Sequence, residues 1–558
     1  MSPHASRRPW ALLLLLFSPV LPALQPPDRS EAERALLAGD CKGAVEGYLA
    51  SGLADRDPRT IERALEVARA CRNLPAASQA ADRLFELDGE NVEALRLIGL
   101  VALETWRLDF ARKVYRELLA KPDVEADRAL AELLPELAEG DATPAAWLVF
   151  RDLVDRDKVS AGTLSTLARM ACNADDLSAC RELIAAARAK GGGNEARTIR
   201  LLAAAAAAQG DERVALAEAD LVAQGDPENH RFARIETLLA LDRLDQAREE
   251  LIAIESNREA GNERIVADAD RRLALLALSM GDETEAERRF GARLGRDRGA
   301  AEALFYLAVI AERRGRKDVA LQSYRQLAAA GAGLPPRIRA ARLLLERNDR
   351  NEALKFFDEM LRSGRSDAIE VEISRSRALQ DAGFTDDALA TLDAALERFP
   401  SHPELLYQRA VVLDAGGRTR EGVKVFEDLL AMRPGDGNVQ NALGYTLADR
   451  KRQLPRAEKL IREALAQRPD SAAFLDSLGW VRFRRGDARA ALPVLERAWR
   501  LSREAEIGAH WGEVLWATGE KAAARAIWAR ALLIAPEAKP LRSTIERLAG
   551  EGRKSGQR

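Results

Sequence analysis

The sequence has few of the residues and motifs with which enzymes perform chemistry. Its four histidines form no HExxH arrangement, and its four cysteines form no CxxC pair or cysteine–histidine cluster. The patterns GxGxxG, GxxxxGK[ST] and GxSxG are missing as well, and with them the usual signals of dinucleotide binding, phosphate binding and an esterase nucleophile. We expect a protein that is not an enzyme and that holds no cofactor or metal.

An excess of charge of one sign is also missing. The chain has 85 basic and 88 acidic residues, interleaved along its length, and a formal net charge of −3. This balance argues against a nucleic acid or an acidic membrane surface as the partner. The carboxylates are spread along the sequence in the manner of solvated helix faces.

Long apolar runs are confined to the first residues. Arg7 and Arg8 precede an apolar run over residues 10–17, which prolines and Ala23 follow. This layout predicts a secretory signal peptide over residues 1–23, and the run is shorter than the ~20 residues of a spanning helix. The arginine pair also permits a twin-arginine export signal. We expect an exported, periplasmic chain, with association with the outer membrane left open and no integral membrane segment after the leader is removed.

The rest of the sequence has the composition of amphipathic helices. Hydrophobic residues make up 47% and charged residues 31%, whereas aromatic residues make up only 5%. Alanine, leucine, arginine and glutamate dominate, which favours helices over strands.

One spacing recurs along the chain. The segment SLGWVRFRRGDARAALPVLERA has Gly479, Gly486 and Ala491 at positions 8, 15 and 20 of a repeat, and the same register starts again 33 residues later at Gly512. Fifteen repeats, 32 to 39 residues apart, can be placed by their position-8 residue: Ala32, Leu65, Gly99, Leu134, Leu167, Ala203, Ile235, Ala274, Ala308, Ala341, Ser376, Ala410, Gly444, Gly479 and Gly512.

Position 15 tests this register independently. It is Gly or Asn in nine repeats: Gly39, Gly210, Gly281, Gly315, Asn348, Gly383, Gly417, Gly486 and Gly519. These residues tolerate the left-handed conformation in which a helix often ends. Alanine recurs at position 20, where two helices must approach closely, and proline follows the second helix at Pro227, Pro400, Pro434, Pro469 and Pro536. Each repeat is therefore predicted to be a helix–turn–helix.

This register resembles the tetratricopeptide repeat (TPR), a helix pair of about 34 residues. The resemblance implies an all-α fold, a right-handed α-solenoid of about 15 helix pairs, in which each pair buries its apolar face against its neighbours. We divide the chain into the leader at 1–23, divergent N-terminal repeats at 24–230, central repeats at 231–400, best-matching C-terminal repeats at 401–536, and a capping helix with a basic tail at 537–558.

The register also groups the four cysteines into two pairs. Cys172 falls near the end of the first helix of its repeat and Cys180 near the start of the second, while Cys41 and Cys71 fall near the turns of the first two repeats. In an oxidising compartment both pairs could form disulfides. Small buried thiols are the alternative interpretation, and the sequence leaves both open.

In TPR arrays the first helix of each repeat lines the inner face. Positions 2, 5, 9, 12 and 13 of the last repeats select a candidate partner-binding face made of Asn438, Asn441, Tyr445, Asp476, Trp480, Phe483, Arg484 and Trp516, with Asp449, Glu506 and Glu513 beside them. Amides can hydrogen-bond an extended backbone, and aromatic rings supply contact area at low entropic cost. Trp480 and Trp516 are central because their positions have no evident packing role; ordinary packing is the alternative.

The run NALGY, LDSLGWV and EIGAHWGEVLWATGEKAAARAIWARAL is similar, over residues 438–536, to a family of exported Gram-negative TPR proteins. That family includes the outer-membrane lipoprotein that serves as adaptor and activator of a periplasmic carboxyl-terminal processing protease. The resemblance implies a scaffold that binds a serine protease and presents cell-wall hydrolases to it. This chain departs from the adaptor, which needs a lipidated cysteine directly after its signal: residues 21–25 contain none, and the first cysteine is Cys41.

Two alternatives remain beside the adaptor. The chain could be the TPR scaffold of an envelope assembly, such as exopolysaccharide export or secretion. It could be an enzyme only if a compact domain of another fold lay within the poorly matching residues 125–225.

Overall fold

A computed structural model describes residues 27–139, 141–225, 231–257, 262–295, 299–363, 368–536 and 538–549. The predicted leader and the basic tail lie outside the described residues. The described part contains 31 α-helices and no strand, which confirms the predicted all-α class. None of these helices is long and apolar enough to cross a membrane.

The chain forms two units, and each combines an earlier segment with a later one. Unit 1 consists of the described residues up to Ala94 together with Phe290–Met432, and unit 2 consists of Leu95–Arg289 together with the described residues from Arg433 onward. Each unit is described by itself below.

The helices of unit 1 are α1 (Pro27–Leu37), α2 (Cys41–Ala54), α3 (Pro58–Ala70), α4 (Leu74–Asp88), α18 (Ala300–Arg313), α19 (Lys317–Ala329), α20 (Leu334–Glu346), α21 (Arg350–Ser363), α22 (Ala368–Asp381), α23 (Thr385–Arg398), α24 (Pro403–Ala415) and α25 (Thr419–Met432). Helices α5 (Val92–Glu104) and α17 (Glu283–Arg293) cross the unit boundaries.

The helices of unit 2 are α6 (Leu108–Leu119), α7 (Ala126–Leu137), α8 (Thr143–Leu153), α9 (Ala161–Asn173), α10 (Leu177–Ala189), α11 (Ala196–Ala208), α12 (Glu212–Gly225), α14 (Ala233–Ala240), α15 (Leu244–Ser256), α16 (Glu263–Ser279), α26 (Gly437–Asp449), α27 (Leu454–Gln467), α28 (Ala472–Arg484), α29 (Ala488–Leu501), α30 (Ala505–Ala517), α31 (Lys521–Ile534) and α32 (Lys539–Ala549).

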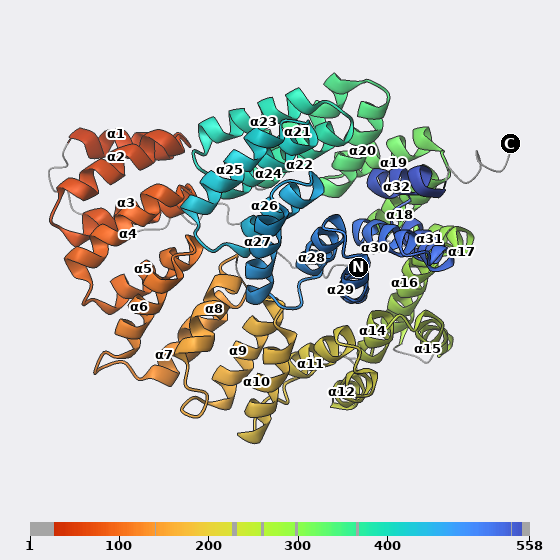
Figure 1. Cartoon of the computed structure of the whole chain (residues 1–558), viewed down its shortest axis with the longest axis horizontal. Coiled ribbons are helices and arrows are strands. Elements are labelled where there is room, and N and C mark those ends of the chain that lie inside the picture. Colours follow the sequence, from red (N-terminus) through yellow and green to blue (C-terminus); the bar gives the residue numbers. More distant parts are fainter. Residues whose placement is uncertain are drawn as a thin grey trace. The chain divides into compact units, whose positions relative to one another are not determined.

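Consecutive helices lie side by side as pairs, as Figure 1 shows within each unit. All fifteen position-8 residues lie in the first helix of such a pair, from Ala32 in α1 to Gly512 in α30. Several second helices begin at a side-chain cap, since the Asp176 carboxylate accepts from the Ala179 amide at α10 and the Asp487 carboxylate accepts from the Ala490 amide at α29. Such caps satisfy amides that have no partner inside the helix.

The turn inside each pair needs a left-handed residue. All nine glycines and asparagines predicted at position 15 have positive φ, from +64° at Asn348 to +96° at Gly486. Non-glycine residues take the same conformation in further turns, namely Arg72, Trp106, Asp175, Asp242 and Lys451. The turn geometry therefore holds even where the side chain disfavours it.

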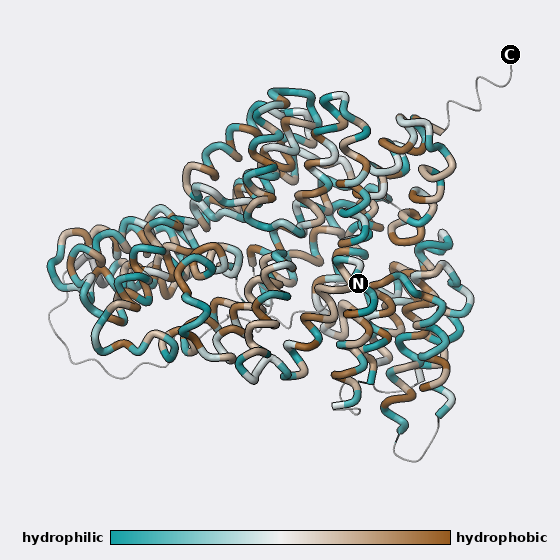
Figure 2. Tube along the Cα trace, turned by 60° about the horizontal axis from the view of Figure 1, so that its bottom comes forward, coloured by the Kyte–Doolittle hydropathy of each residue, from teal (hydrophilic) through white to brown (hydrophobic). Residues whose placement is uncertain are grey.

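Close approach of paired helices explains the small residues at positions 8 and 20. Alanines such as Ala491 and Ala524 are fully buried. A Cβ added to Gly479 would lie 2.5 Å from Cγ of Leu495, and one added to Gly512 would meet the indole of Trp528. Because of this repeated packing, hydrophobic residues recur along the helices rather than gathering in one block (Figure 2).

The poorly matching region 125–225 continues the same architecture. Its described residues form α7 to α12, in which α9 pairs with α10 and α11 with α12, while α7 and α8 both pack on α9. The enzyme alternative thus loses the segment on which it depended.

Two disulfides are present. Cys41 and Cys71 join the start of α2 to the end of α3, and Cys172 and Cys180 join α9 to α10 across their turn. The Cα atoms lie 5.5 and 5.2 Å apart, within the usual span of a disulfide.

Candidate functional site

The predicted site residues meet on three successive first helices, α26, α28 and α30. At the centre is His510 of α30, whose Nδ1 lies 2.8 Å from Oδ2 of Asp476 on α28. The imidazole stacks on the indole of Trp480, with ring centroids 4.1 Å apart and an interplanar angle of 20°. We call these first helices' residues Asn441, Tyr445, Asp449, Asp476, Trp480, Glu506 and His510 the α26–α28–α30 face.

Tyr445 ties α26 to this centre. Its hydroxyl donates to Oε1 of Glu506 at 3.0 Å and lies 3.5 Å from Nε2 of His510. Burial raises the pKa of Tyr445 well above its ordinary value, and the carboxylates of Glu506 and Asp476 raise it further. The phenol therefore stays protonated and keeps its proton for this hydrogen bond.

The charge of His510 is set by two opposing effects. Burial lowers the pKa of the imidazole, but the Asp476 carboxylate, through its charge and hydrogen bond, outweighs burial and raises that pKa above the ordinary value, with help from Glu506 and Glu513. Folding therefore favours the protonated form more than it is favoured in a free histidine. When it is protonated, the imidazole places a positive charge on the indole face of Trp480, an attractive geometry.

The other side of Trp480 is occupied as well. Its Nε1 donates to Oδ1 of Asp449 at 3.3 Å, and the guanidinium of Arg484 lies 5.2 Å from the indole. Phe483 packs 5.5 Å away, centroid to centroid. Trp480 is only 4% exposed, so the expectation that it lacks a packing role is wrong: it fills the space between α26 and α30.

Trp516 also has packing partners that the sequence did not indicate. Its ring stacks on Trp528 at 5.5 Å, and the cationic groups of Lys521 and Arg525 lie 5.1 and 5.2 Å from its centroid. Trp516 is half-buried and belongs to the core between α30 and α31. It stands apart from the contacts around His510.

Two acceptors of the predicted set are left without a partner. Oδ1 of Asp476 and Oδ1 of Asn441 are both buried and receive no hydrogen bond within the described residues. They occupy position 5 of neighbouring first helices. An unpaired buried acceptor costs about 1–3 kcal/mol, a cost that a donor group placed beside these oxygens would remove. Asn438, by contrast, already accepts from Nη1 of Arg468 at 2.9 Å.

His510 is the residue at the centre of this candidate site that sequence reasoning missed. It stands at position 6, one residue beyond the positions chosen for the inner face. The sequence feature that could have indicated it is the rarity of histidine, since only four histidines occur in 558 residues. The described residues contain no cluster of His, Cys, Asp or Glu that could hold a metal.

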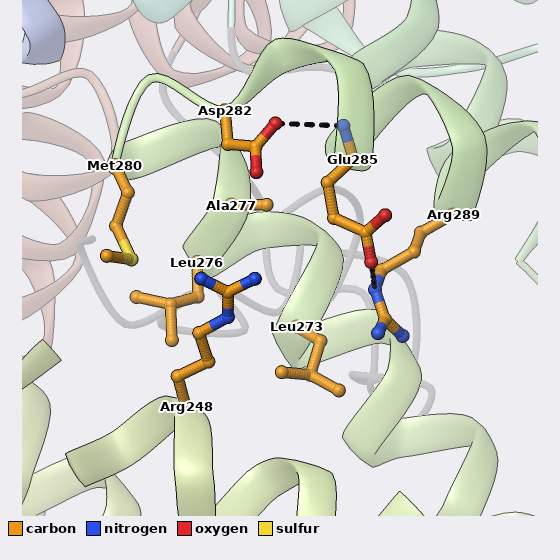
Figure 3. A pocket seen from close by; sticks show the side chains of 8 residues that line it. All are labelled: Arg248, Leu273, Leu276, Ala277, Met280, Asp282, Glu285 and Arg289. Carbon is orange, nitrogen blue, oxygen red and sulfur yellow. Dashed lines mark hydrogen bonds and ion pairs between the residues drawn. The ribbon is translucent and has the colours of Figure 1, made fainter. Parts of the chain in front are cut away.

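A second candidate is a small pocket in unit 2 between α15, α16 and α17 (Figure 3). Its volume is about 130 Å³, and Leu273, Leu276 and Met280 form its apolar lining. Arg289 borders it, 8% exposed, and donates to Glu255, Asp270 and Glu285. Hydrogen bonds from Arg288 and Arg289 lower the pKa of Glu285 to about 2 against the effect of burial. Because these charges satisfy one another, the pocket has the character of a structural ion-pair network.

A family model of the tetratricopeptide repeat matches residues 271–335, 373–437, 407–472 and 441–506. The chain thus contains tetratricopeptide repeats, and repeats of this kind are protein-interaction modules. Over 211 residues it is 30% identical to the TPR repeat-containing protein PA4667 of Pseudomonas aeruginosa PAO1. The aligned stretch covers 38% of this chain and 36% of that protein. The chain therefore spans about a third of the length of this curated relative.

Solved structures give matches of the same kind. The thermophilic TPR protein TTC0263 of Thermus thermophilus is 25% identical and aligns with 33% of this chain and 98% of its own, with a TM-score of 0.30. Yeast Tom70 is 15% identical and aligns with 83% of this chain and 96% of its own, with a TM-score of 0.36.

Proposed function

We propose that the chain is a non-enzymatic scaffold of the bacterial envelope, and that its α26–α28–α30 face binds a segment of a partner protein. The observation that carries this proposal is the pair of buried, unpartnered acceptors at Asn441 and Asp476. Both side chains belong to the set that the repeat register assigns to partner contact. A peptide backbone or a basic side chain supplies the donors that these two oxygens lack.

Aromatic rings and charged groups alternate on the face. Nε1 of Trp480 donates to Asp449, and His510, which contacts Asp476, stacks on the indole. Acidic groups outnumber arginines there, so the face favours donor groups over a partner's carboxylate.

In its specific form, the proposal is that the partner is a carboxyl-terminal processing protease and that the chain presents cell-wall hydrolases to it. Its support is the resemblance of residues 438–536 to the exported adaptor family. The second candidate is a scaffold of an envelope assembly, such as exopolysaccharide export. The exported, periplasmic location that both require rests on the sequence of residues 1–23.

The test is capture of the tagged chain after crosslinking in the periplasm of its own host, followed by mass spectrometry. We expect a carboxyl-terminal processing protease among the captured proteins, and we expect Asn441→Ala combined with Asp476→Ala to reduce its recovery at least about tenfold, since two buried hydrogen bonds are lost. Recovery of export or polymer-synthesis components instead would move the function to envelope assembly.

A matched control separates binding from folding. Tyr445→Phe removes the hydroxyl that donates to Glu506. Tyr324→Phe removes a hydroxyl in unit 1 that also donates to a carboxylate, that of Glu312 at 2.8 Å. Only Tyr445→Phe should weaken capture. Equal recovery of all partners by every variant that folds would refute the proposed face.

A further inference from the structure

Each disulfide lies beside a left-handed turn that contacts a distant segment of its own unit. In unit 2, Cys172 and Cys180 enclose the α9–α10 turn, where Asp175 has a φ of +53°. That turn contacts the loop between α27 and α28, 293 residues further along the chain. We call the contact between residues 175–177 and 468–470 the clasp.

The clasp consists of four hydrogen bonds that involve both backbones. Nε and Nη2 of Arg468 donate to Oδ2 of Asp175, the former at 3.1 Å. The Asp470 amide donates to the Asp175 carbonyl at 2.8 Å, and the Leu177 amide donates to Oδ2 of Asp470 at 2.9 Å. Asp470 is only 5% exposed, so these bonds form largely away from water.

The Leu177 amide makes the clasp measurable. Leu177 is the first residue of α10, so its amide has no acceptor within the helix. The carboxylate of Asp470 therefore acts as a cap supplied from another repeat. Protection of this one amide from hydrogen exchange therefore shows whether the clasp is formed, independently of whether α10 is folded.

The α9–α10 turn needs a restraint to keep its conformation. A left-handed backbone is unfavourable for an aspartate, and an unrestrained turn has many other conformations available. The disulfide links the last turn of α9 to the first turn of α10, with a sequence separation of 8. A crosslink of this kind removes alternative conformations from the loop that it closes. Cys172 is half-buried and Cys180 is buried, so Cys172 is the more accessible residue of the pair.

We propose that the Cys172–Cys180 disulfide is a thiol-responsive staple of the clasp. When it is oxidised, the turn holds Asp175 and Leu177 in the positions that meet the 468–470 loop. A dithiol that attacks it forms its own disulfide, supplies two electrons and two protons, and leaves Cys172 and Cys180 as thiols. The turn then relaxes and the loop separates from it, while α9 and α10 remain folded.

The experiment is hydrogen exchange at single-amide resolution on the mature chain, with and without dithiothreitol. Reduction should speed exchange at Leu177 and at Asp470 together by about tenfold or more. The amide of Leu475, which donates to the Ser471 carbonyl at the start of α28 at 3.0 Å, should not change. Thiol alkylation, read by mass, verifies that Cys172 and Cys180 have been reduced.

Three variants complete the test. Cys172→Ser with Cys180→Ser should reproduce the reduced state, whereas Cys41→Ser with Cys71→Ser should leave Leu177 protected. Asp470→Ala, with its disulfide intact, should expose Leu177 and so show that the reporter works. Protection that survives full reduction would overturn the proposal. So would loss of protection throughout α9 and α10, because the disulfide would then hold the helices rather than the clasp.

Discussion

Each unit contains a left-handed turn beside a disulfide, and each turn contacts a distant segment, but the two contacts differ in burial. In unit 1, Arg72 follows the disulfide-bonded Cys71, has a φ of +49° and reaches Glu404 with Nη1 3.4 Å from Oε1. Both side chains are about half exposed, at 48% and 41%. In unit 2, Arg468 contacts Asp175, and the two side chains are 21% and 34% exposed.

The two contacts differ in the number of backbone hydrogen bonds and in their exposure to water. Unit 2 adds two hydrogen bonds that involve backbone amides, and Asp470 lies almost fully buried between Leu177 and Arg497. An exposed ion pair contributes about 0–1 kcal/mol, whereas a buried, charge-assisted set contributes more and is costly to break. A left-handed turn beside a disulfide therefore positions a contact, but burial decides how much the contact stabilises.

The largest loss of stability among these changes should come from Asp470→Ala. The change removes the cap of α10, leaves the Leu177 amide without an acceptor and leaves Arg497 with the Pro469 carbonyl alone, so we expect a loss of about 2–4 kcal/mol in unit 2. Tryptophan fluorescence during urea unfolding measures it selectively, because the seven tryptophans of the described residues all lie in unit 2. An unchanged midpoint would show that water replaces the cap at no cost.

Acid should affect both units, because each contains a carboxyl group with a strongly lowered pKa. The pKa of Glu285 is lowered to about 2 by Arg288 and Arg289. Burial raises the pKa of Glu404 in unit 1, yet the contact with His402 and the charge of Arg72 outweigh burial and bring it to about 2. Nδ1 of His402 lies 2.9 Å from Oε2 of Glu404, an ion-pair distance without hydrogen-bond geometry.

A lowered carboxyl pKa stabilises the fold above the unfolded value of 4.5, and this stability is lost as the pH falls toward 2. For Glu285, 24% exposed, we expect a loss of about 1–2 kcal/mol after screening by water. Glu285→Gln should remove that part of the pH dependence from fluorescence-detected unfolding of unit 2. A variant that retains the full acid slope would assign the effect to other carboxylates.

Arg72→Ala should do little to unit 1, at most about 0.5 kcal/mol, because the Arg72 side chain is 48% exposed and its contact with Glu404 is long, at 3.4 Å. The matched change Arg468→Ala should cost unit 2 about 1–3 kcal/mol, since it leaves Asp175 unpaired and also frees Asn438. Far-ultraviolet circular dichroism during unfolding follows both variants on one scale. Equal losses would mean that burial does not separate the two contacts.

These contrasts show which parts of the molecule local sequence encodes. Helix pairs and turns follow from small residues at positions 8, 15 and 20, since each such residue has a local steric role. The clasp could not be predicted in this way, because Asp175 and Arg468 are 293 residues apart and neither belongs to a repeating pattern.

The candidate site divides in the same manner. The register identified Tyr445, Asp476 and Trp480 because each occupies a fixed position of its own helix. It missed His510, because the stacking of this ring on Trp480 depends on how far one repeat rotates relative to the next. Likewise, glycine marked most of the predicted left-handed turns, but at Arg72, Asp242 and Lys451 the conformation is imposed by the helices on either side.

The smallest expected effect on stability tests whether the flanking helices impose the left-handed conformation at Lys451. It has a φ of +51° and is exposed, whereas the left-handed Asp242 forms ion pairs with Arg503 and Arg530. Lys451→Gly should relieve the backbone strain, partly offset by the greater entropy of the unfolded chain, for a gain of about 0.5 kcal/mol. Asp242→Gly should instead destabilise unit 2, because the lost ion pairs outweigh the same relief. Urea midpoints by tryptophan fluorescence measure both, and a loss at Lys451→Gly would show that the lysine itself stabilises the turn.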